Sequence, residues 1–530
     1  MSLAELVLPT DSREGSRRAL LTLSAILFLT FLDTTIMSVA LSDLQATLNT
    51  TVADMQWIVN AYAFVFASFM LTFGSLGDRY GRRRVMLAGV AVFVVGSVFG
   101  ALSPNTESLI AARALMGLGA AACEPGTLSI LRHVFPDRAD RARALGIWAA
   151  VAGLALALGP VIGGLLVGLG GWPAIFWFNL AAGVAVFVAA LSTVPESSDP
   201  ESARFDIAGF VLGPVMLGTL VFAIILGETA GYTAAHVLAL FAVAVATGAV
   251  FVAVELRTKA PMLRVDYLKR PAFAGSLAVA FATYFGVFSI FFLTALYLQI
   301  VLAYSAFSIA TLFVPMALGM IVSSALAGRW VAESGPRIPV AVGCFAAGAG
   351  VLFTDLALRG ESAPYLPLVF SLLLAGVGFG IAVVPITSVA LSSIPARHSG
   401  MAASATTTAR EVGTVIGVAA LGSLFNTKLI TFLTERLIQL DVPEEWRAVV
   451  IDAVITGKFQ GAEEAQKLYG DIVAKVVTAA YDAVHSGVSL SLLVAGCVIL
   501  GSGFVAYATF SAKRLALGEP DEPESPPQEA

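Results

Sequence analysis

Long apolar runs separated by short polar segments fill almost the whole chain of 530 residues. A helix that crosses the hydrocarbon core of a membrane needs about 20 mostly apolar residues, and fourteen runs are about that long or longer. The pattern therefore predicts an all-α polytopic membrane protein with fourteen transmembrane helices. The runs lie near residues 19–42, 55–77, 84–102, 107–131, 142–169, 172–194, 206–227, 235–255, 271–300, 307–328, 337–358, 364–392, 404–426 and 487–511.

Lys and Arg residues gather in alternate connections between these runs. Of the 31 Lys and Arg residues, 22 fall in the termini and in the loops on one side, whereas the short loops on the other side carry only Arg359. Cytoplasmic loops of membrane proteins carry the excess of positive charge. We therefore expect a multi-pass protein of the cell (inner, cytoplasmic) membrane with both termini in the cytoplasm. The first run shows no small-residue cleavage site, so we interpret it as a retained span.

A repeat underlies the count of helices. The run at 107–131 contains Gly117 and Gly119 followed by Pro125, and about 260 residues later the run at 364–392 contains Gly376, Gly378 and Pro385. Two six-helix halves around a midplane site are a common design of secondary transporters. The predicted organisation is a tail at 1–18, a first half at 19–194, two inserted helices with their linkers at 195–270, a second half at 271–511 and a disordered tail at 512–530.

The longest loop on the outer side, 427–486, mixes acidic and basic residues with Val, Ile, Leu and Ala at helical spacing. This spacing predicts a short amphipathic hairpin outside the membrane.

Composition narrows the class of protein. Hydrophobic residues make up 58% of the chain and charged residues 13%, whereas about a quarter of the residues of a soluble protein are charged. This excludes a water-soluble globular enzyme. The net charge of −5 gives no sign of nucleic-acid binding. The three cysteines form no CxxC or Cys/His cluster and no G-x-x-x-x-G-K-[ST] loop occurs, so we expect no metal, no cofactor and no use of ATP.

Charged residues inside the runs are the candidate functional residues. A charge at the bilayer centre costs about 2.5–3.5 kcal/mol on insertion scales, so each one needs a reason to be there. Asp33 lies in the middle of the first run, and a carboxyl group that takes up a proton near neutral pH can couple transport to protons. Arg113 and Glu124 are eleven residues apart and project from one helix face, about 16 Å apart along the axis.

Each of these charges has an alternative interpretation. Arg113 can pair with Asp33, or it can extend to the outer surface. Glu124 can bind a cationic substrate or a proton, or it can be a neutral, hydrogen-bonded acid. Asp33 can also belong to an ion pair between helices without a role in transport.

The second half adds Arg410 and Glu411 in the run at 404–426. Neighbouring residues on a helix point about 100° apart, so we expect Arg410 on the close-packed glycine face and Glu411 towards the cavity, as a substrate or proton site. Aromatic residues follow the run at 271–300 at helical spacing, either as the lining of a pocket for flat cations or as a packed or lipid-facing surface. We expect Trp57 and Tyr62 at the membrane interface.

Four motifs resemble the major facilitator superfamily, and specifically its fourteen-helix drug:H⁺ antiporters. The segment from Gly74 to Arg84 matches the superfamily's loop signature G-x-L-x-D-R-x-G-R-[KR]-x. The stretch Leu32–Ile36 resembles the first-helix signature of the fourteen-helix group, with Ser38 and Ser42 where that group usually has Asn and Pro. Arg113–Gly119 matches R-x-x-x-G-x-G, and Gly153–Gly164 matches the exporter motif of the fifth helix.

The resemblance implies roles for individual residues. Proton coupling would involve Asp33, Arg113 and Glu411. Substrate binding would involve Glu124, Glu411, Tyr284, Phe288, Phe292 and Gln299. The loop signature would act as a conformational latch through Gly74, Asp78, Arg79, Gly81, Arg82 and Arg83, or it would serve only as a topology signal. The exporter motif would be a kinked helix that slides between two packings, with Gly153, Gly159, Pro160, Gly163 and Gly164.

The expected function is export of lipophilic, cationic small molecules in exchange for protons, by a monomer in contact with membrane lipids. One alternative is export of an endogenous lipid or secondary metabolite with the same fold. Another is a membrane sensor that keeps the fold and transports nothing.

Overall fold

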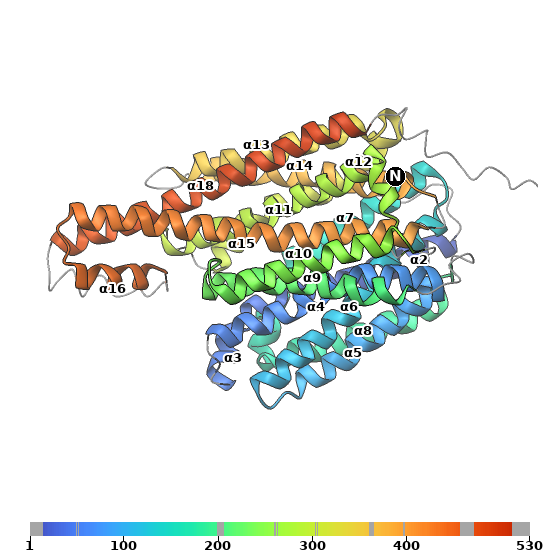
Figure 1. Ribbon diagram of the computed structural model, residues 1–530, viewed down its shortest axis with the longest axis horizontal. Coiled ribbons are helices and arrows are strands. Elements are labelled where there is room, and N and C mark those ends of the chain that lie inside the picture. The colour runs from blue at the N-terminus through green and yellow to red at the C-terminus, as the bar shows by residue number, and fades with distance from the viewer. Residues whose placement is uncertain are drawn as a thin grey trace, which may run out of the picture.

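The computed structural model describes most of the chain, and some side chains within its helices are not described. The described residues are 14–48, 50, 52–198, 206–258, 261, 263–302, 304, 306–359, 365–395, 398–455 and 471–510. Every regular element in these ranges is a helix (Figure 1). The helices are α2 (Glu14–Ile36), η1 (Met37–Val39), α3 (Leu41–Leu48), α4 (Val52–Tyr80), α5 (Arg82–Ala101), α6 (Thr106–Val134), α7 (Arg138–Gly170), α8 (Pro173–Thr193), α9 (Ile207–Ala230), α10 (Ala235–Glu255), η2 (Val265–Lys269), α11 (Pro271–Ile300), α12 (Ala306–Ser334), α13 (Arg337–Leu358), α14 (Tyr365–Ser392), α15 (Ser399–Gln439), α16 (Glu444–Ile455) and α18 (Asp471–Thr509).

Twelve helices of the described chain are long and apolar enough to cross a membrane. Helices α7 and α11 are as long as the others, with 33 and 30 residues, but contain residues whose side chains are not described. Each predicted run lies mostly within one helix, except that the first run, 19–42, extends from α2 through η1 into α3. The described chain is that of an all-helical multi-pass membrane protein. The total of fourteen spans stays a prediction.

The two halves repeat the same glycine contacts. In the first half a Cβ atom on Gly119 of α6 would lie 2.6 Å from the carbonyl oxygen of Gly89 on α5, too close for any side chain. In the second half a Cβ atom on Gly378 of α14 would lie equally close, 2.6 Å, to the carbonyl oxygen of Gly343 on α13. Small residues let membrane helices approach this closely. Helices α5–α6 and α13–α14 therefore pack through the same kind of glycine contact, and the two-half repeat stays a prediction.

Helices α9 and α10 form a hairpin between the halves (Figure 1). The hairpin packs mainly on α4 of the first half, where the ring of Phe222 lies 5.5 Å from that of Trp57 and 6.2 Å from that of Phe64. It also contacts α15 of the second half.

The described part of the segment predicted as an outer loop, 427–486, is mainly helical and consists of the end of α15, the separate helix α16 and the start of α18. Helix α15 runs unbroken for 41 residues to Gln439, and α18 begins at Asp471. Leu429, Leu433 and Leu437 continue the buried stripe of α15 at helical spacing, which explains why the helix does not end at the membrane surface. Together with α16 the two helices form an arm beyond the rest of the bundle (Figure 1). The described residues of 427–486 are thus mostly extensions of the two flanking helices, and residues 456–470 lie outside the described chain.

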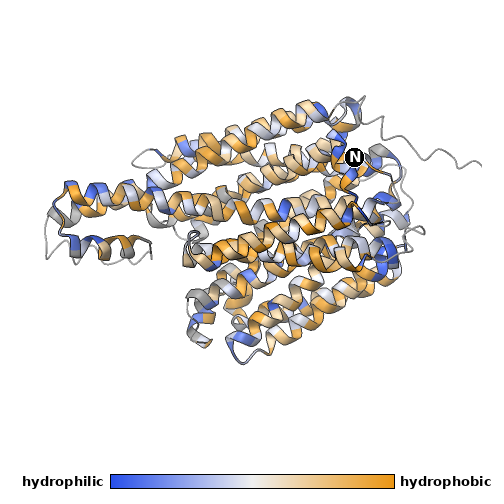
Figure 2. Cartoon of the chain, viewed as in Figure 1, coloured by the Kyte–Doolittle hydropathy of each residue, from blue (hydrophilic) through white to orange (hydrophobic). Residues whose placement is uncertain are grey.

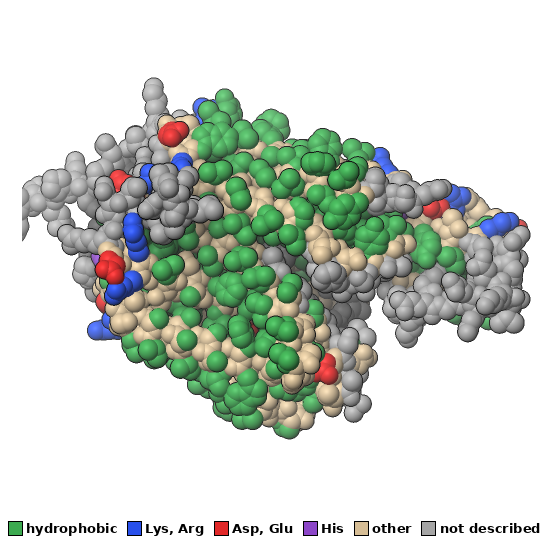
Figure 3. Space-filling model, turned by 180° about the vertical axis from the view of Figure 1, so that it is seen from behind, with side chains coloured by type: hydrophobic (Ala, Val, Ile, Leu, Met, Phe, Trp, Pro, Cys, Tyr) green, Lys and Arg blue, Asp and Glu red, His purple; other side chains and the backbone are tan. Residues whose placement is uncertain are grey.

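The two ends of the bundle differ in charge. Hydrophobic residues form a broad band around the middle, and Lys and Arg gather at the end where the described N-terminus lies (Figures 2 and 3). We call this end, which holds the arginines at the end of α4, the start of α5, the end of α6 and the start of α7, the basic end. The helices of the two halves converge there and spread apart at the opposite end (Figure 1).

Candidate functional site

Asp33 and Arg113 form an ion pair inside the first half. Both side chains are fully buried, and Nη1 of Arg113 on α6 donates a hydrogen bond to Oδ2 of Asp33 on α2. Nδ2 of Asn179 on α8 donates to the other carboxylate oxygen at 2.7 Å. Nε of Arg113 donates to the carbonyl oxygen of Ile58 on α4 at 3.1 Å. A proton can reach this carboxylate only if the site opens.

Tyr62 completes this first ion-pair site. Its ring centroid lies 4.6 Å from Cζ of Arg113, and its hydroxyl donates to the carbonyl oxygen of Thr30 at 3.0 Å. Tyr62 is 1% exposed, so its prediction as an interfacial residue was wrong. The ring stacks on the guanidinium because a cation is attracted to an aromatic face in a site without water.

Glu124 and Arg410 form a second ion pair, and this one joins the halves. Nη2 of Arg410 on α15 donates to Oε1 of Glu124 on α6 at 2.9 Å, and to Oγ1 of Thr407 at 3.0 Å. Both charged side chains are buried. The rings of Trp148 and Tyr284 lie 5.2 and 5.4 Å from Cζ of Arg410.

The second ion pair is under-satisfied within the described chain. Oε2 of Glu124, and Nε and Nη1 of Arg410, have no hydrogen-bond partner by the usual geometry. Glu411, the next residue on α15, is only partly buried, and it interacts electrostatically with Arg410 and Glu124. This central cluster of Glu124, Arg410 and Glu411 holds two acids and one cation in a largely buried place.

The structure describes only some of the side chains in the aromatic stripe of α11. Tyr284 is 8% exposed and lies beside Arg410. The side chains of Phe288, Phe292 and Gln299 lie outside the described part of the chain. Gly413 and Gly417 of α15 pack against the backbone of α11 at Phe281 and Phe285. The glycine face of α15 is therefore closely packed, as we expected from the sequence, and its neighbour is α11.

Asp78, at the end of α4, links the two halves at the basic end. Its carboxylate oxygens accept hydrogen bonds from the backbone N–H groups of Gly400 and Met401, each at 3.0 Å, in the first turn of α15. Arg82 holds the same carboxylate from the start of α5, with Nη2 at 2.7 Å and Nε at 2.9 Å from Oδ1. An acid at a helix N-terminus satisfies free N–H groups and complements the helix dipole.

The other residues of the loop signature shape this contact. Gly74 lies against Gly400 and Ser404 of α15, where a Cβ atom would not fit. Gly81 has φ of 106°, which favours glycine. The backbone N–H of Arg83 donates to Oε1 of Glu196 at 3.0 Å. Arg79 lies over the ring of Tyr80, with 5.1 Å from Cζ to the centroid.

Arg132, at the end of α6, makes a complementary contact that the sequence did not single out. Its guanidinium donates to the carbonyl oxygens of Leu391, near the end of α14, and of Ile394, the latter at 3.2 Å. A cation at a helix C-terminus complements the helix dipole. The first half therefore holds both sides of the α14–α15 connection, by an arginine and by an acid.

The exporter motif of α7 packs on the helix that carries Asp33. A Cβ atom on Gly159 would collide with Thr35, and one on Gly163 would lie 2.8 Å from the carbonyl oxygen of Ile36. Gly153 faces the other half, where a Cβ atom would lie 3.1 Å from Sδ of Met320 on α12. The side chain of Pro160 lies outside the described part, and Gly164 faces open space.

Comparison with known proteins identifies the family. The model of the Major Facilitator Superfamily matches residues 23–418. The chain belongs to this superfamily. It is 35% identical over 443 residues to the multidrug resistance protein Stp of Mycobacterium tuberculosis, which covers 83% of this chain and 82% of that protein. It is 29% identical over 504 residues to the multidrug efflux pump LfrA of Mycolicibacterium smegmatis, with coverage of 95% and 98%.

The fold agrees with solved structures of the superfamily. The proton:xylose symporter XylE is similar with a TM-score of 0.60 and 14% sequence identity, over 95% of this chain and 99% of that one. Membership of the Major Facilitator Superfamily makes the chain a transporter of small molecules and not an enzyme.

The sequence analysis did not identify two residues that contact the buried acids. Asn179, the partner of Asp33, is the one amide in the apolar helix α8, and that isolation was a usable signal. Arg410 was placed on a packing face, and its pairing with Glu124 could not be inferred because 286 residues separate them.

Proposed function

We propose that this member of the Major Facilitator Superfamily exports lipophilic, cationic small molecules in exchange for protons. The observation that carries the proposal is the buried Glu124–Arg410 ion pair between the halves, with Glu411 beside it. Charges inside a membrane are costly and mark pathways for ions and substrates. Relatives named as a multidrug resistance protein and a multidrug efflux pump support export of drugs.

The proposed orientation places the basic end in the cytoplasm and gives the chain fourteen spans. The excess of Lys and Arg at that end supports this orientation. Because the halves are joined there by Asp78 and Arg132, the structure would represent a state that is closed to the cytoplasm.

The proposed cycle uses the two ion pairs in turn. A proton from the outer side reaches Glu411 first, since this acid is the partly exposed one of the cluster. Protonation of Glu124 weakens its attraction to Arg410 and frees the halves to rock. Protonation of Asp33 releases Arg113 in the same way within the first half, and the change passes to α7 through Thr35.

The cationic substrate would compete with protons for the acids of the central cluster. Glu411 provides the charge, and the rings of Trp148 and Tyr284, which now lie beside Arg410, offer faces for a cation. We include Phe288, Phe292 and Gln299 in this site from their positions on α11. One proton moving inward through about 100 mV supplies roughly 2.3 kcal/mol. Export of a monovalent cation against the same potential costs an equal amount, so concentrating such a substrate requires the pH gradient or more than one proton per cation.

The test is transport by the purified protein in liposomes. Ethidium serves as the monovalent cation, and a trapped pH dye reports proton movement. We expect ethidium to drive proton movement in the wild type and not in Asp33→Asn or Glu411→Gln. The matched control is Asp266→Asn on η2. The hydrogen bond from Lys269 lowers the pKa of Asp266, so this acid stays charged at neutral pH and carries no proton.

Three outcomes would contradict parts of the proposal. Coupled ethidium efflux that survives Asp33→Asn would remove Asp33 from the coupling mechanism. Lipid-driven proton movement without ethidium efflux would favour the lipid or metabolite exporter. Ligand binding without any flux would favour the sensor.

A further inference from the structure

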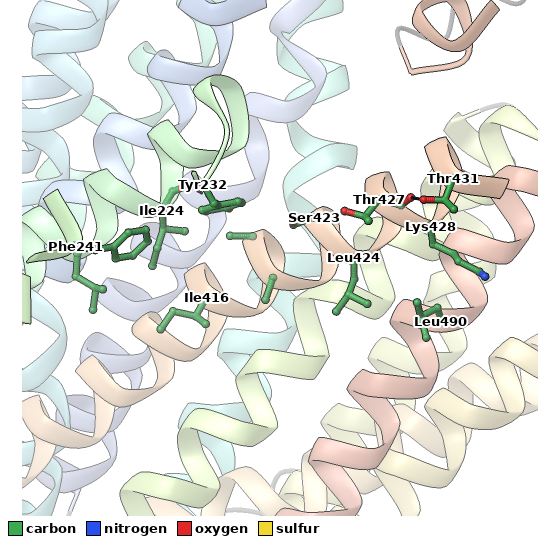
Figure 4. Close-up of a pocket in the computed structure, with 13 residues that line it drawn as sticks. Ile224, Tyr232, Phe241, Ile416, Ser423, Leu424, Thr427, Lys428, Thr431 and Leu490 are labelled. Atoms are coloured by element: carbon green, nitrogen blue, oxygen red, sulfur yellow. Dashed lines mark hydrogen bonds between the residues drawn. The ribbon is translucent and has the colours of Figure 1, made fainter. Parts of the chain in front are cut away.

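A groove separates the inserted hairpin from the second half. It has a volume of about 570 Å³, within the usual range for small-molecule sites, and lies between α9 and α10 on one side and α15 on the other (Figure 4). Most of its lining is apolar, and Leu220, Phe241, Ile416 and Leu490 are representative. None of the charged residues of the central cluster lines it, so the groove is a separate site.

The lining changes character along the groove. Phe241 and Ile224 lie towards one end, and the polar stretch of α15 with Thr427, Lys428 and Thr431 lies towards the other (Figure 4). A cavity with an apolar body and a polar end matches an amphiphile, whose chains need apolar contact and whose headgroup needs hydrogen bonds and a counter-charge. Lys428 is exposed, so its ammonium group is accessible to such a headgroup.

The charge of the groove selects the class of ligand. Among the thirteen described residues that line it, Lys428 is the one charged side chain, and none is acidic. A groove of this charge disfavours the cationic substrates of the proposed efflux function. It favours an anionic headgroup, because the ammonium group of Lys428 can form a charge-assisted hydrogen bond with a phosphate.

We propose that this groove binds an anionic phospholipid, with an acyl chain along α9 and α10 and the phosphate at Lys428. The lipid would contact the hairpin, which packs mainly on α4 of the first half, and α15 of the second half. It would therefore act as a wedge between the two moving bodies and stabilise the arrangement of helices in which the groove exists.

Native mass spectrometry of the detergent-purified full-length protein tests the proposal. The probes are phosphatidylglycerol and phosphatidylcholine with the same acyl chains. We expect selective retention of phosphatidylglycerol by the wild type. Lys428→Ala should weaken that retention by up to about fivefold, the contribution of one exposed ion pair. The matched control is Lys269→Ala, which removes an exposed lysine at the basic end and should leave retention unchanged.

A second variant tests the groove itself. Ala420→Phe fills its apolar part while Lys428 stays in place, and should also reduce retention of phosphatidylglycerol. If this variant fails to fold, Lys428→Ala decides, since an exposed side chain does not support the fold. Equal retention of the two lipids, no effect of Lys428→Ala, an equal loss with Lys269→Ala, or full retention by folded Ala420→Phe would overturn the proposal.

Discussion

Glu124 of α6 and Arg410 of α15 meet at 2.9 Å across the interface between the two halves. They are 286 residues apart in sequence, and both are buried. A buried ion pair of this kind contributes little net stability, but removing one partner leaves an uncompensated charge. Because the partners belong to different halves, forming or breaking this pair depends on how the halves meet.

Removing Arg410 alone should destabilise the protein more than removing both charges of the pair. Arg410→Met leaves Glu124 buried without a counter-charge, and should cost about 3–5 kcal/mol of stability. The double variant Glu124→Gln with Arg410→Met should recover most of that loss without recovering efflux. Thermal unfolding of the detergent-solubilised protein measures stability, and Arg436→Met on the exposed part of α15 is the matched control. Additive losses in the double variant would show that the two residues do not act as a pair.

Asp78→Asn should loosen the basic end. The neutral amide loses the ionic contact with Arg82 and cannot accept from Gly400 and Met401 as a carboxylate does. Electron spin resonance uses labels at position 84 on α5 and at position 269 on η2, which packs on α11 of the second half, in a variant lacking exposed Cys497. The distance between the labels reports the separation of the halves at this end. We expect a longer and broader distance distribution with Asp78→Asn than with Asp78. An unchanged distribution would restrict the motif to a topology signal.

Arg132→Gln should also lengthen and broaden the distance distribution, but by less than Asp78→Asn. The contacts of Arg132 with the carbonyl oxygens of Leu391 and Ile394 complement a helix C-terminus, an effect of about 0.3–1 kcal/mol. Combined with Asp78→Asn, the two changes should be more than additive in the same distance measurement, because both residues hold one short connection. Independent effects would mean that the α14–α15 connection is not a single latch.

Features set by local sequence could be predicted well. The apolar runs predicted the long helices, and the glycine motifs predicted close helix packing of the kind seen at Gly89–Gly119 and Gly343–Gly378. The Asp33–Arg113 pair was among the alternatives because an arginine near a buried acid has few other partners. These predictions rest on helix periodicity and on the cost of burying charge, both of which can be inferred from one sequence.

Features set by packing between distant helices could not be predicted. The spacing of Arg410 from Gly413 and Gly417 indicated a packing face, but it did not reveal Glu124 as the partner on α6. We expected Tyr62 at the membrane interface because it lies near the start of an apolar run, whereas its ring packs inside the protein against the guanidinium of Arg113. Helical structure in 427–486 was expected from its spacing, but its continuity with α15 and α18 was not, because polar residues end the apolar runs before these helices end.

Two glycines of the exporter motif differ in packing, so one can serve as a control for the other. Gly159 lies against Thr35, two residues after Asp33, whereas Gly164 faces open space. The methyl group of Gly159→Ala must displace Thr35, and overpacking of this kind costs about 1–3 kcal/mol. Gly164→Ala should be neutral or slightly stabilising, since alanine favours helix over glycine by about 1 kcal/mol. We expect about tenfold slower ethidium efflux with Gly159→Ala, equivalent to roughly 1.4 kcal/mol, and normal efflux with Gly164→Ala.

The cause of the loss can be separated from a general need for glycine. If the methyl group acts by colliding with Thr35, shortening that neighbour in Gly159→Ala with Thr35→Ala should restore part of the efflux. If efflux stays low and Thr35→Ala alone is active, the glycine is needed for flexibility of α7 and not for its contact with α2. The first result would link the motif directly to the helix that carries Asp33.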